Sequence, residues 1–208
     1  MGMARAAAPA MEVADAMLEA MVDLDDLRPS SLRPLKRVEY DRLVDLGMFD
    51  DEKIELLRGQ LVTMSPQGLP HTRLYVWLTR FLIERLDRTF EVRPASPFAA
   101  TDDSEPEPDL MVTRPDPAAS SHPTAAILVI EISSSSIRKD RRIKMPIYAE
   151  SGAPEYWILD VSREGQLVVE VYTEPTPTGY AKLVCLRDGD ILRPLHLPFE
   201  IAVADLPR

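Results

Sequence analysis

The feature that most constrains the fold is a nearly all-aliphatic segment at residues 126–132, AILVIEI, which contains a single acid, Glu131. Such a run predicts a strand buried on both faces, because a strand with one wet face alternates apolar and polar residues. A strand of this kind belongs at the centre of a sheet. An unpaired buried carboxylate is costly, so Glu131 needs a cation partner, a metal ion or a cleft at the strand end.

The rest of the chain supplies the helices and strands that such a sheet requires. Helical periodicity predicts helices over 38–46, over 71–88 and over 143–151, and Pro146 fits the last only in its first turn. A hairpin is expected over 53–66 with its turn at Arg58-Gly59, and strands at 89–98, 109–114, 126–132, 155–162, 166–173 and 180–187. This order predicts a mixed β-sheet flanked by helices, an α/β or α+β core.

Two regions of different composition divide the chain. Residues 1–34 form an N-terminal arm, with a partly disordered start, an acidic amphipathic helix over 11–27 and a linker at 28–34. The helix either docks on a partner or remains a solvated acidic helix. Residues 35–208 form one folded domain.

Composition excludes several functional classes. The chain has 34 acidic and 24 basic side chains, a net charge of −10, which argues against a protein that coats nucleic acid but not against a nuclease. No apolar run approaches the length of a membrane span, and the N-terminus has no convincing signal core. Cys185 is the only cysteine and the three histidines are far apart, so we expect no internal disulfide, no zinc site and a cytoplasmic location.

Four ionisable residues lie at positions in the predicted strands and helices that folding alone does not require to be charged. Glu55 lies in the first arm of the hairpin, Asp109 opens a strand after a proline, Glu131 lies in the aliphatic strand, and Lys144 is near the start of the following helix. Two carboxylates at neighbouring strand ends can hold a divalent metal, which polarises a phosphoryl oxygen and acidifies bound water. A lysine beside them can stabilise the developing charge. Two carboxylates, a divalent metal ion and a lysine are together sufficient to hydrolyse a phosphodiester.

Helical spacing separates the polar residues that follow the strand. Asp140 and Lys144 fall on one side of a helix with Ile147 and Tyr148. Four further cations lie mostly elsewhere on it, where they either contact phosphates or form a solvated face: Arg138, Lys139, Arg141 and Arg142.

Several segments of the sequence resemble those of a known family, the Uma-type restriction endonucleases of the PD-(D/E)XK nuclease superfamily. The matching segments cover about two thirds of the chain: IELLRGQLVTMSP, His71 at a helix start, PEPDLMV, and LVIEISSSSIRKDRRIKMPIYAESGAPEYWILD. The last is the most specific, since it orders a strand Glu, a serine-rich turn, Asp-Arg, Lys, Tyr-Ala, Gly and Glu-Tyr-Trp.

The resemblance implies a restriction-endonuclease-like core that cleaves DNA with Mg²⁺ or Mn²⁺. Asp109 and Glu131 would be metal ligands, Glu55 a further acid, and Lys144 the active-site lysine. One departure stands out, because the superfamily's lysine usually lies two residues after the glutamate and Ser133 occupies that position. His71 is a candidate substrate contact. A homodimer is expected, since two copies most simply cut both strands of a duplex.

Simpler interpretations remain beside these. Glu131 can form a buried ion pair with Lys144 and no metal, Glu55 can be a solvated hairpin residue, and His71 can cap or pack its helix. The chain can then be an inactive binding or scaffold protein on the same fold. A third alternative is a metal-dependent hydrolase of RNA or of a small phosphoester.

Overall fold

The computed structural model describes residues 32–162 and 165–208. Contacts within the chain separate residues 34–208 from the preceding residues as one compact unit. The helix expected over 11–27 lies outside the described residues. None of the described helices is long and apolar enough to cross a membrane.

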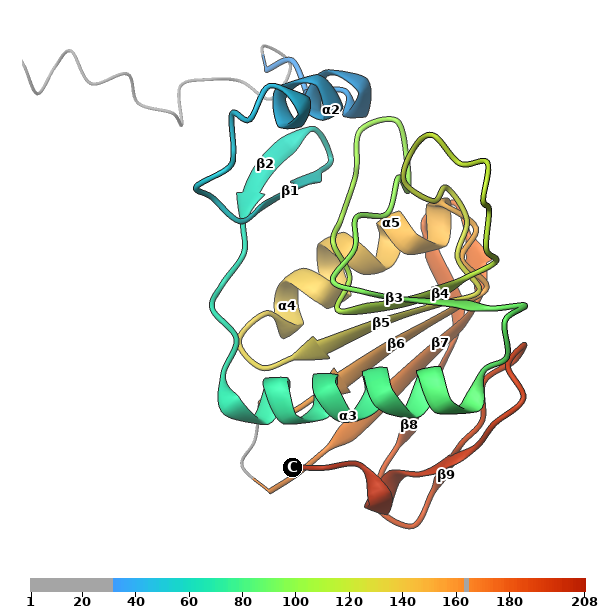
Figure 1. Cartoon of the computed structure of the whole chain (residues 1–208). Helices are drawn as coiled ribbons and strands as arrows, with labels where there is room; N and C mark the ends of the chain where they lie inside the picture. Colours follow the sequence, from blue (N-terminus) through green and yellow to red (C-terminus); the bar gives the residue numbers. More distant parts are fainter. Residues whose placement is uncertain (1–31, 163–164) are drawn as a thin grey trace, which may run out of the picture. The chain divides into compact units, whose positions relative to one another are not determined.

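A six-stranded mixed sheet forms the centre of the unit (Figure 1). Its strands, in spatial order, are β3 (Glu91–Pro94), β4 (Leu110–Thr113), β5 (Leu128–Ser133), β6 (Glu155–Asp160), β7 (Val168–Thr176) and β8 (Gly179–Leu186). Only β5 and β6 pair in parallel, across the helical crossover that joins them. All six residues of β5 are buried, so the prediction of a central strand covered on both faces is confirmed.

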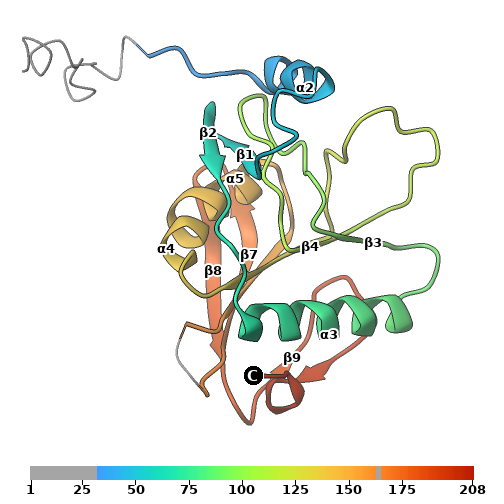
Figure 2. The ribbon, with the colours of Figure 1, turned by 60° about the vertical axis from the view of Figure 1, so that its left-hand side comes forward.

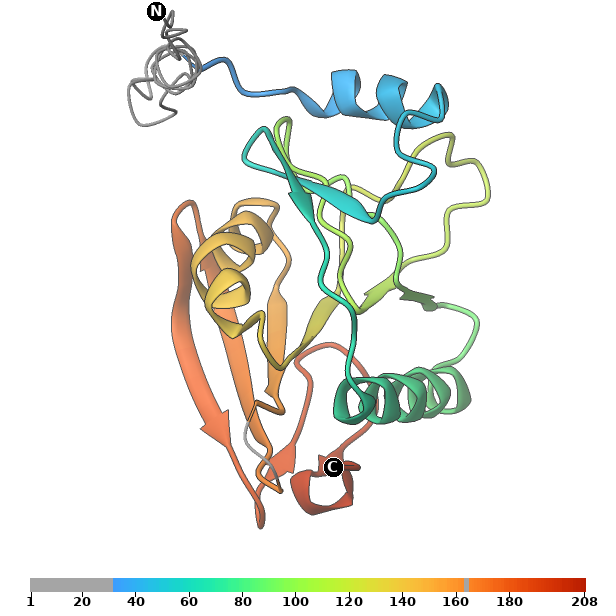
Figure 3. The same cartoon turned by 90° about the vertical axis from the view of Figure 1, so that its left-hand side faces the viewer.

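Helices cover both faces of this sheet (Figures 1 and 3). Helix α3 (Leu69–Arg85) packs Leu74, Leu78 and Leu82 against one face, as its apolar stripe predicts. On the other face, Tyr148 of α5 (Met145–Glu150) packs with Val129 and other residues whose side chains alternate with those of the first core. The mixed sheet between helical layers confirms the predicted fold class.

The crossover from β5 to β6 starts earlier than the sequence predicts. It runs through α4 (Ile137–Lys139), a π-helical turn (Asp140–Lys144) and α5, where a helix was expected only over 143–151. Pro146 lies in the first turn of α5, as required. The π turn precedes it, and the N–H of Met145 donates to the carbonyl of Asp140, five residues back. Turns of this kind often mark functional sites.

The predicted hairpin is a separate small sheet, β1 (Ile54–Leu57) with β2 (Gln60–Thr63). Its turn lies at Arg58 and Gly59, as expected, and both have positive φ, 51° and 75°. A Cβ at Gly59 would lie 2.3 Å from the Cβ of Pro34, so a side chain would not fit there. Figure 2 shows the chain leaving β2 and running past α4 to the start of α3.

Shorter elements complete the unit. Helix α2 (Arg37–Asp45) confirms the helix expected over 38–46. Strand β3 is shorter than the predicted 89–98. A second two-stranded sheet, β9 (Ile191–Leu192) with β10 (Ile201–Ala202), and a 3₁₀ turn (Val203–Asp205) follow β8 and were not predicted, because strands of two residues carry no periodicity.

Candidate active site

A small pocket lies where the carboxyl end of β5 meets the start of β4, the N-terminus of α3 and the helical crossover. It is lined by backbone and side chains of residues 64–67 and 134–136, and by a set of ionisable residues: His71, Glu107, Asp109, Glu131, Lys139, Asp140 and Lys144. Most of the site residues predicted from sequence therefore lie around one pocket. Arg138, Arg141 and Arg142 are not among its lining residues.

Three groups contact the carboxylate of Asp109 and hold it in place. Because β4 runs antiparallel to β5, Asp109 stands beside the end of β5, and its Oδ2 accepts a hydrogen bond of 2.7 Å from the N–H of Ile132. Its Oδ1 lies 3.0 Å from His71 Nε2 and accepts a bond of 3.2 Å from Gln67 Nε2. His71 thus contacts the carboxylate, and its Nδ1 is buried with no hydrogen-bond partner among the described residues.

Glu131 is buried, with 5% of its surface exposed. Its Oε1 accepts hydrogen bonds from Lys144 Nζ at 2.9 Å and from the Tyr148 hydroxyl at 2.7 Å. Burial, together with Asp140, Asp109 and Glu55, raises the pKa of Glu131 to about 8, although Lys144 acts in the opposite direction. Burial thus opposes the charged form of Glu131, and the contact with Lys144 favours it.

Lys144 is equally buried, with 3% of its surface exposed. Its ammonium group bridges Glu131 and Glu55, 2.9 and 2.8 Å away. Burial alone would lower the pKa of Lys144, but Glu131, Glu55 and Asp140 outweigh it, and the pKa is raised. Lys144 is thus a fixed positive charge, and the helical stripe predicted from sequence brings it to the glutamate that lies 13 residues earlier.

Glu55 reaches the same cluster from the hairpin. Its side chain is fully buried and accepts hydrogen bonds of 2.8 Å from both Lys139 and Lys144. The N–H of Glu107 adds a bond of 3.3 Å. Burial raises the pKa of Glu55, but the two lysines dominate, so the pKa is lowered and the group is anionic.

The four surface cations of the crossover have different environments. Lys139 forms an ion pair with Glu55. The guanidinium group of Arg141 forms a bidentate ion pair with the carboxylate of Glu170 in β7. Arg138 and Arg142 are exposed and form no ion pair with another described residue. Of the four cations, Arg138 and Arg142 are therefore the two whose guanidinium groups are available to bind an anionic ligand.

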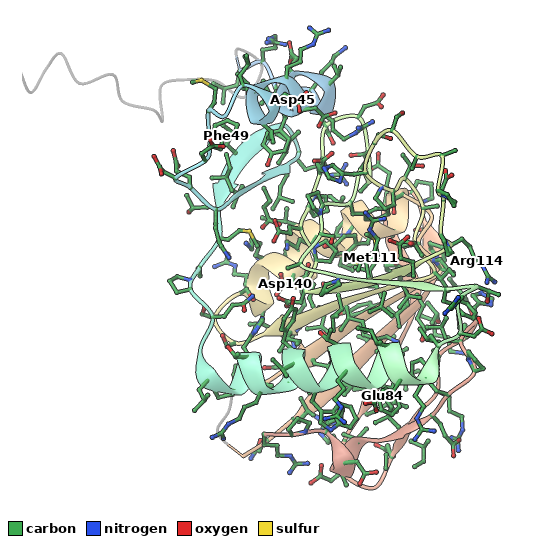
Figure 4. All side chains as sticks on the ribbon, in the orientation of Figure 1. Asp45, Phe49, Glu84, Met111, Arg114 and Asp140 are labelled. Atoms are coloured by element: carbon green, nitrogen blue, oxygen red, sulfur yellow. The ribbon has the colours of Figure 1, made fainter. Side chains whose placement is uncertain are left out.

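Two residues that support the site were not among the candidate site residues predicted from the sequence. Asp140, which is labelled in Figure 4, is buried. It accepts hydrogen bonds from the hydroxyls of Ser133 and Ser136, at 2.5 and 2.8 Å. Ser133, at the position where the superfamily usually has its lysine, thus binds a helix carboxylate instead. The other is Tyr148, which donates to Glu131. Its position on the stripe of Asp140 and Lys144 was the available signal.

The carboxylate oxygens that line the pocket are the kind of ligand that a hard divalent cation prefers. No group of three or more His, Cys, Asp or Glu converges on a metal-sized position within residues 32–162 and 165–208. Mg²⁺, however, is commonly held by one or two carboxylates, with waters and substrate phosphates completing its shell. Glu131 Oε2 makes no hydrogen bond to the described residues, and Asp109 lines the same pocket. The residues present therefore fit such an ion.

The sheet, its two helical layers and the position of the carboxylates define a restriction-endonuclease-like fold. Among solved structures, the chain is similar to a putative nuclease belonging to DUF820 from Anabaena variabilis ATCC 29413. The two have 16% sequence identity and a TM-score of 0.65, and the match covers 83% of this chain and 97% of that one. At this identity the likeness shows the fold.

Residues 37–204 match the family model Uma2, described as "Putative restriction endonuclease". The chain therefore belongs to the Uma2 family, and the resemblance seen in its sequence is confirmed. Family and fold together place it with restriction-endonuclease-like nucleases. No curated protein matches the chain.

Proposed function

We propose that this protein is a metal-dependent endonuclease that hydrolyses DNA phosphodiester bonds. The observation that carries the proposal is the meeting of Asp109, Glu131 and Lys144 in one pocket at the end of β5. Asp109 and Glu131 would hold Mg²⁺ or Mn²⁺. When bound, that ion would polarise a phosphoryl oxygen and supply a more acidic water.

The protein's own groups have distinct tasks in this proposal. Lys144 keeps its proton, so it serves as a hydrogen-bond donor that orients water and stabilises negative charge on the phosphoryl group. It is not a general base, since a base needs a lowered pKa. His71 and the N–H of Ile132 fix the rotamer of Asp109, and Tyr148 fixes that of Glu131.

Contacts with the DNA backbone are assigned to Arg138 and Arg142, because Lys139 and Arg141 are already paired. Local cations of this kind can meet phosphates even though the whole chain carries a charge of −10. A homodimer would let two copies cut the two strands of a duplex. An exposed Cys185 without a disulfide partner agrees with a reducing cytoplasm.

One observation favours a second candidate, an inactive binding or scaffold protein. Glu131 pairs with Lys144 at 2.9 Å, which is the arrangement that a purely structural carboxylate would adopt. The two candidates differ in the metal, because the scaffold needs none.

Cleavage of supercoiled plasmid with Mg²⁺ or Mn²⁺ tests the proposal. Wild type should convert the plasmid to nicked and linear forms, and chelation of the metal should stop the reaction. Glu131→Gln and Lys144→Met should each reduce the rate at least about 100-fold. Equal activity of wild type and both variants would point to a contaminating nuclease and overturn the assignment. Cleavage of RNA but not of DNA would favour the alternative hydrolase.

A further inference from the structure

Glu55 is the one acid of the cluster whose two oxygens are both occupied by lysines of the same site. Oε1 accepts from Lys139 Nζ and Oε2 lies beside Lys144 Nζ, each at 2.8 Å. In contrast, both described donors to Glu131 contact its Oε1 and leave Oε2 without a hydrogen bond. Glu55 and Glu131 therefore face the pocket in different ways.

This arrangement does not suit Glu55 as a metal ligand. A divalent ion next to it would have to approach between two ammonium groups, and the Coulomb repulsion between like charges at such short range is strong in a buried site. Glu55 is also absent from the residues that line the pocket, whereas both lysines are present. Its carboxylate oxygens therefore contact the two ammonium groups and do not face the pocket.

Backbone hydrogen bonds join the hairpin that contains Glu55 to the segment that precedes Asp109. Leu56 and Glu105 exchange two backbone hydrogen bonds, of 3.3 and 2.8 Å, and the N–H of Gly59 donates to the carbonyl of Asp103. The N–H of Glu107 donates to Glu55 itself. One loop, residues 103–107, thus fixes the hairpin and the start of β4 together.

We propose that Glu55 is a positioning residue, which holds the ammonium groups of Lys139 and Lys144 at the pocket and does not bind the metal. Lys144 is thereby kept between Glu131 and Glu55, and Lys139 is kept at the wall of the pocket. The proposal deepens the endonuclease function and rests on it for the roles of the lysines in catalysis, but the geometry of the contacts can be tested without activity.

The lysine content of the chain makes a direct test possible. There are five lysines, and Lys36, Lys53 and Lys182 are exposed. In protein labelled with ¹⁵N at lysine Nζ, only ammonium groups held by buried acceptors should exchange slowly with water. Wild type should therefore give two slowly exchanging signals, from Lys139 and Lys144.

Glu55→Gln is the test variant and Glu52→Gln is its control, since Glu52 is an exposed acid just before the same strand. Glu55→Gln should lose the slow signal of Lys139 and retain that of Lys144, which still contacts Glu131. Its affinity for Mn²⁺ should stay within about threefold of wild type, because residues that affect affinity from outside contact a metal ligand, whereas Glu55 contacts the two lysines and the N–H of Glu107. Its kcat for plasmid should fall with KM little changed. Glu52→Gln should match wild type in every measurement.

Two results would overturn the proposal: both slow signals persisting in Glu55→Gln, or a fall in Mn²⁺ affinity of tenfold or more. If wild type neither binds Mn²⁺ nor cleaves DNA, the endonuclease function fails, but the lysine signals still decide whether Glu55 holds the lysines. If Glu55→Gln does not fold, Glu55→Asp replaces it. Its shorter side chain should no longer reach both lysines, so the signal of Lys139 should exchange faster with water; two unchanged slow signals would contradict the proposal.

Discussion

At the scale of single residues, the Tyr148 hydroxyl orients the carboxylate that we propose as a metal ligand. Tyr148 is fully buried in the aromatic core beside Tyr156 and Phe98, yet its hydroxyl donates to Glu131. Because Lys144 contacts the same Oε1, the two donors orient the carboxylate and leave Oε2 toward the pocket. Groups that orient a metal ligand commonly matter nearly as much as the ligand itself.

We therefore predict that Tyr148→Phe lowers Mn²⁺ affinity about tenfold and the free energy of unfolding by about 1 kcal/mol. Calorimetric titration and urea denaturation measure the two effects. Tyr180→Phe is the matched control, since the Tyr180 hydroxyl donates to the carbonyl of Ala153 outside the pocket. The control should lose similar stability and keep its affinity. Equal losses of affinity in both variants would contradict the orienting role.

At the scale of elements, the helical crossover combines two tasks. Its inner side delivers Lys144 and Tyr148 to Glu131, and its outer side presents Arg138 and Arg142 to solvent. If these arginines contact phosphates, each alanine variant should weaken DNA binding uniformly across sequences. The slope of log K against log salt should decrease by about 1 per arginine removed.

Fluorescence anisotropy with a labelled duplex at several salt concentrations measures this slope. Arg193→Ala provides the control, because Arg193 is an exposed arginine that pairs with Glu200 and does not line the pocket. An unchanged slope in Arg138→Ala and Arg142→Ala would show that the crossover is a solvated face.

Helix α2 and the acidic loop before β4 provide a pH-dependent contact. Glu105 is buried, its Oε2 has no hydrogen bond among the described residues, and Arg37 is 4.0 Å away. Burial, followed by Asp41, raises the pKa of Glu105 to about 7, although Arg37 opposes this. Tyr40, which also faces Glu105, does not titrate near neutral pH because its own pKa is raised to about 12, mainly by burial.

Since the folded pKa of Glu105 is above its usual value of 4.5, the folded state holds this proton more tightly than the unfolded state. Its contribution to stability is complete below about pH 4.5 and is lost as the pH rises to about 7. The loss is at most about 3.5 kcal/mol, from about 1.4 kcal/mol per pKa unit. Glu105→Gln should flatten this dependence and should be more stable than wild type at pH 8. Thermal unfolding from pH 5 to pH 8 would contradict this if both proteins responded identically.

The predictable and unpredictable parts of the molecule differ in physical origin. The aliphatic run of β5 and the stripe of α3 follow from local patterns, and both were placed correctly. The pairing of Glu55 with Lys139 joins residues 84 positions apart, and no periodicity within a four-residue strand indicates its partner. The π turn at Asp140 also lacks a local signal, because a single wide turn leaves the helical pattern almost unchanged.

At the scale of the whole molecule, the net charge of −10 sets a condition on any nuclease function. Clustered carboxylates repel both DNA and one another, and the raised pKa of Glu131, due first to burial and then to its acidic neighbours, reflects this. A divalent ion would relieve the repulsion and bridge the site to phosphate. We therefore expect this acidic pocket to bind a divalent metal ion.

Calorimetric titration of Mn²⁺ into wild type and into Asp109→Ala, with and without a duplex oligonucleotide, tests this claim most directly. Wild type should bind Mn²⁺, at least in the presence of DNA, and Asp109→Ala should bind none at this site. Asp109 contacts Ile132, Gln67 and His71 but not Lys144, so its removal does not break the buried Lys144–Glu131 pair. No binding by wild type under either condition would contradict the metal site and would establish the pocket as a buried ion-pair cluster of a scaffold protein.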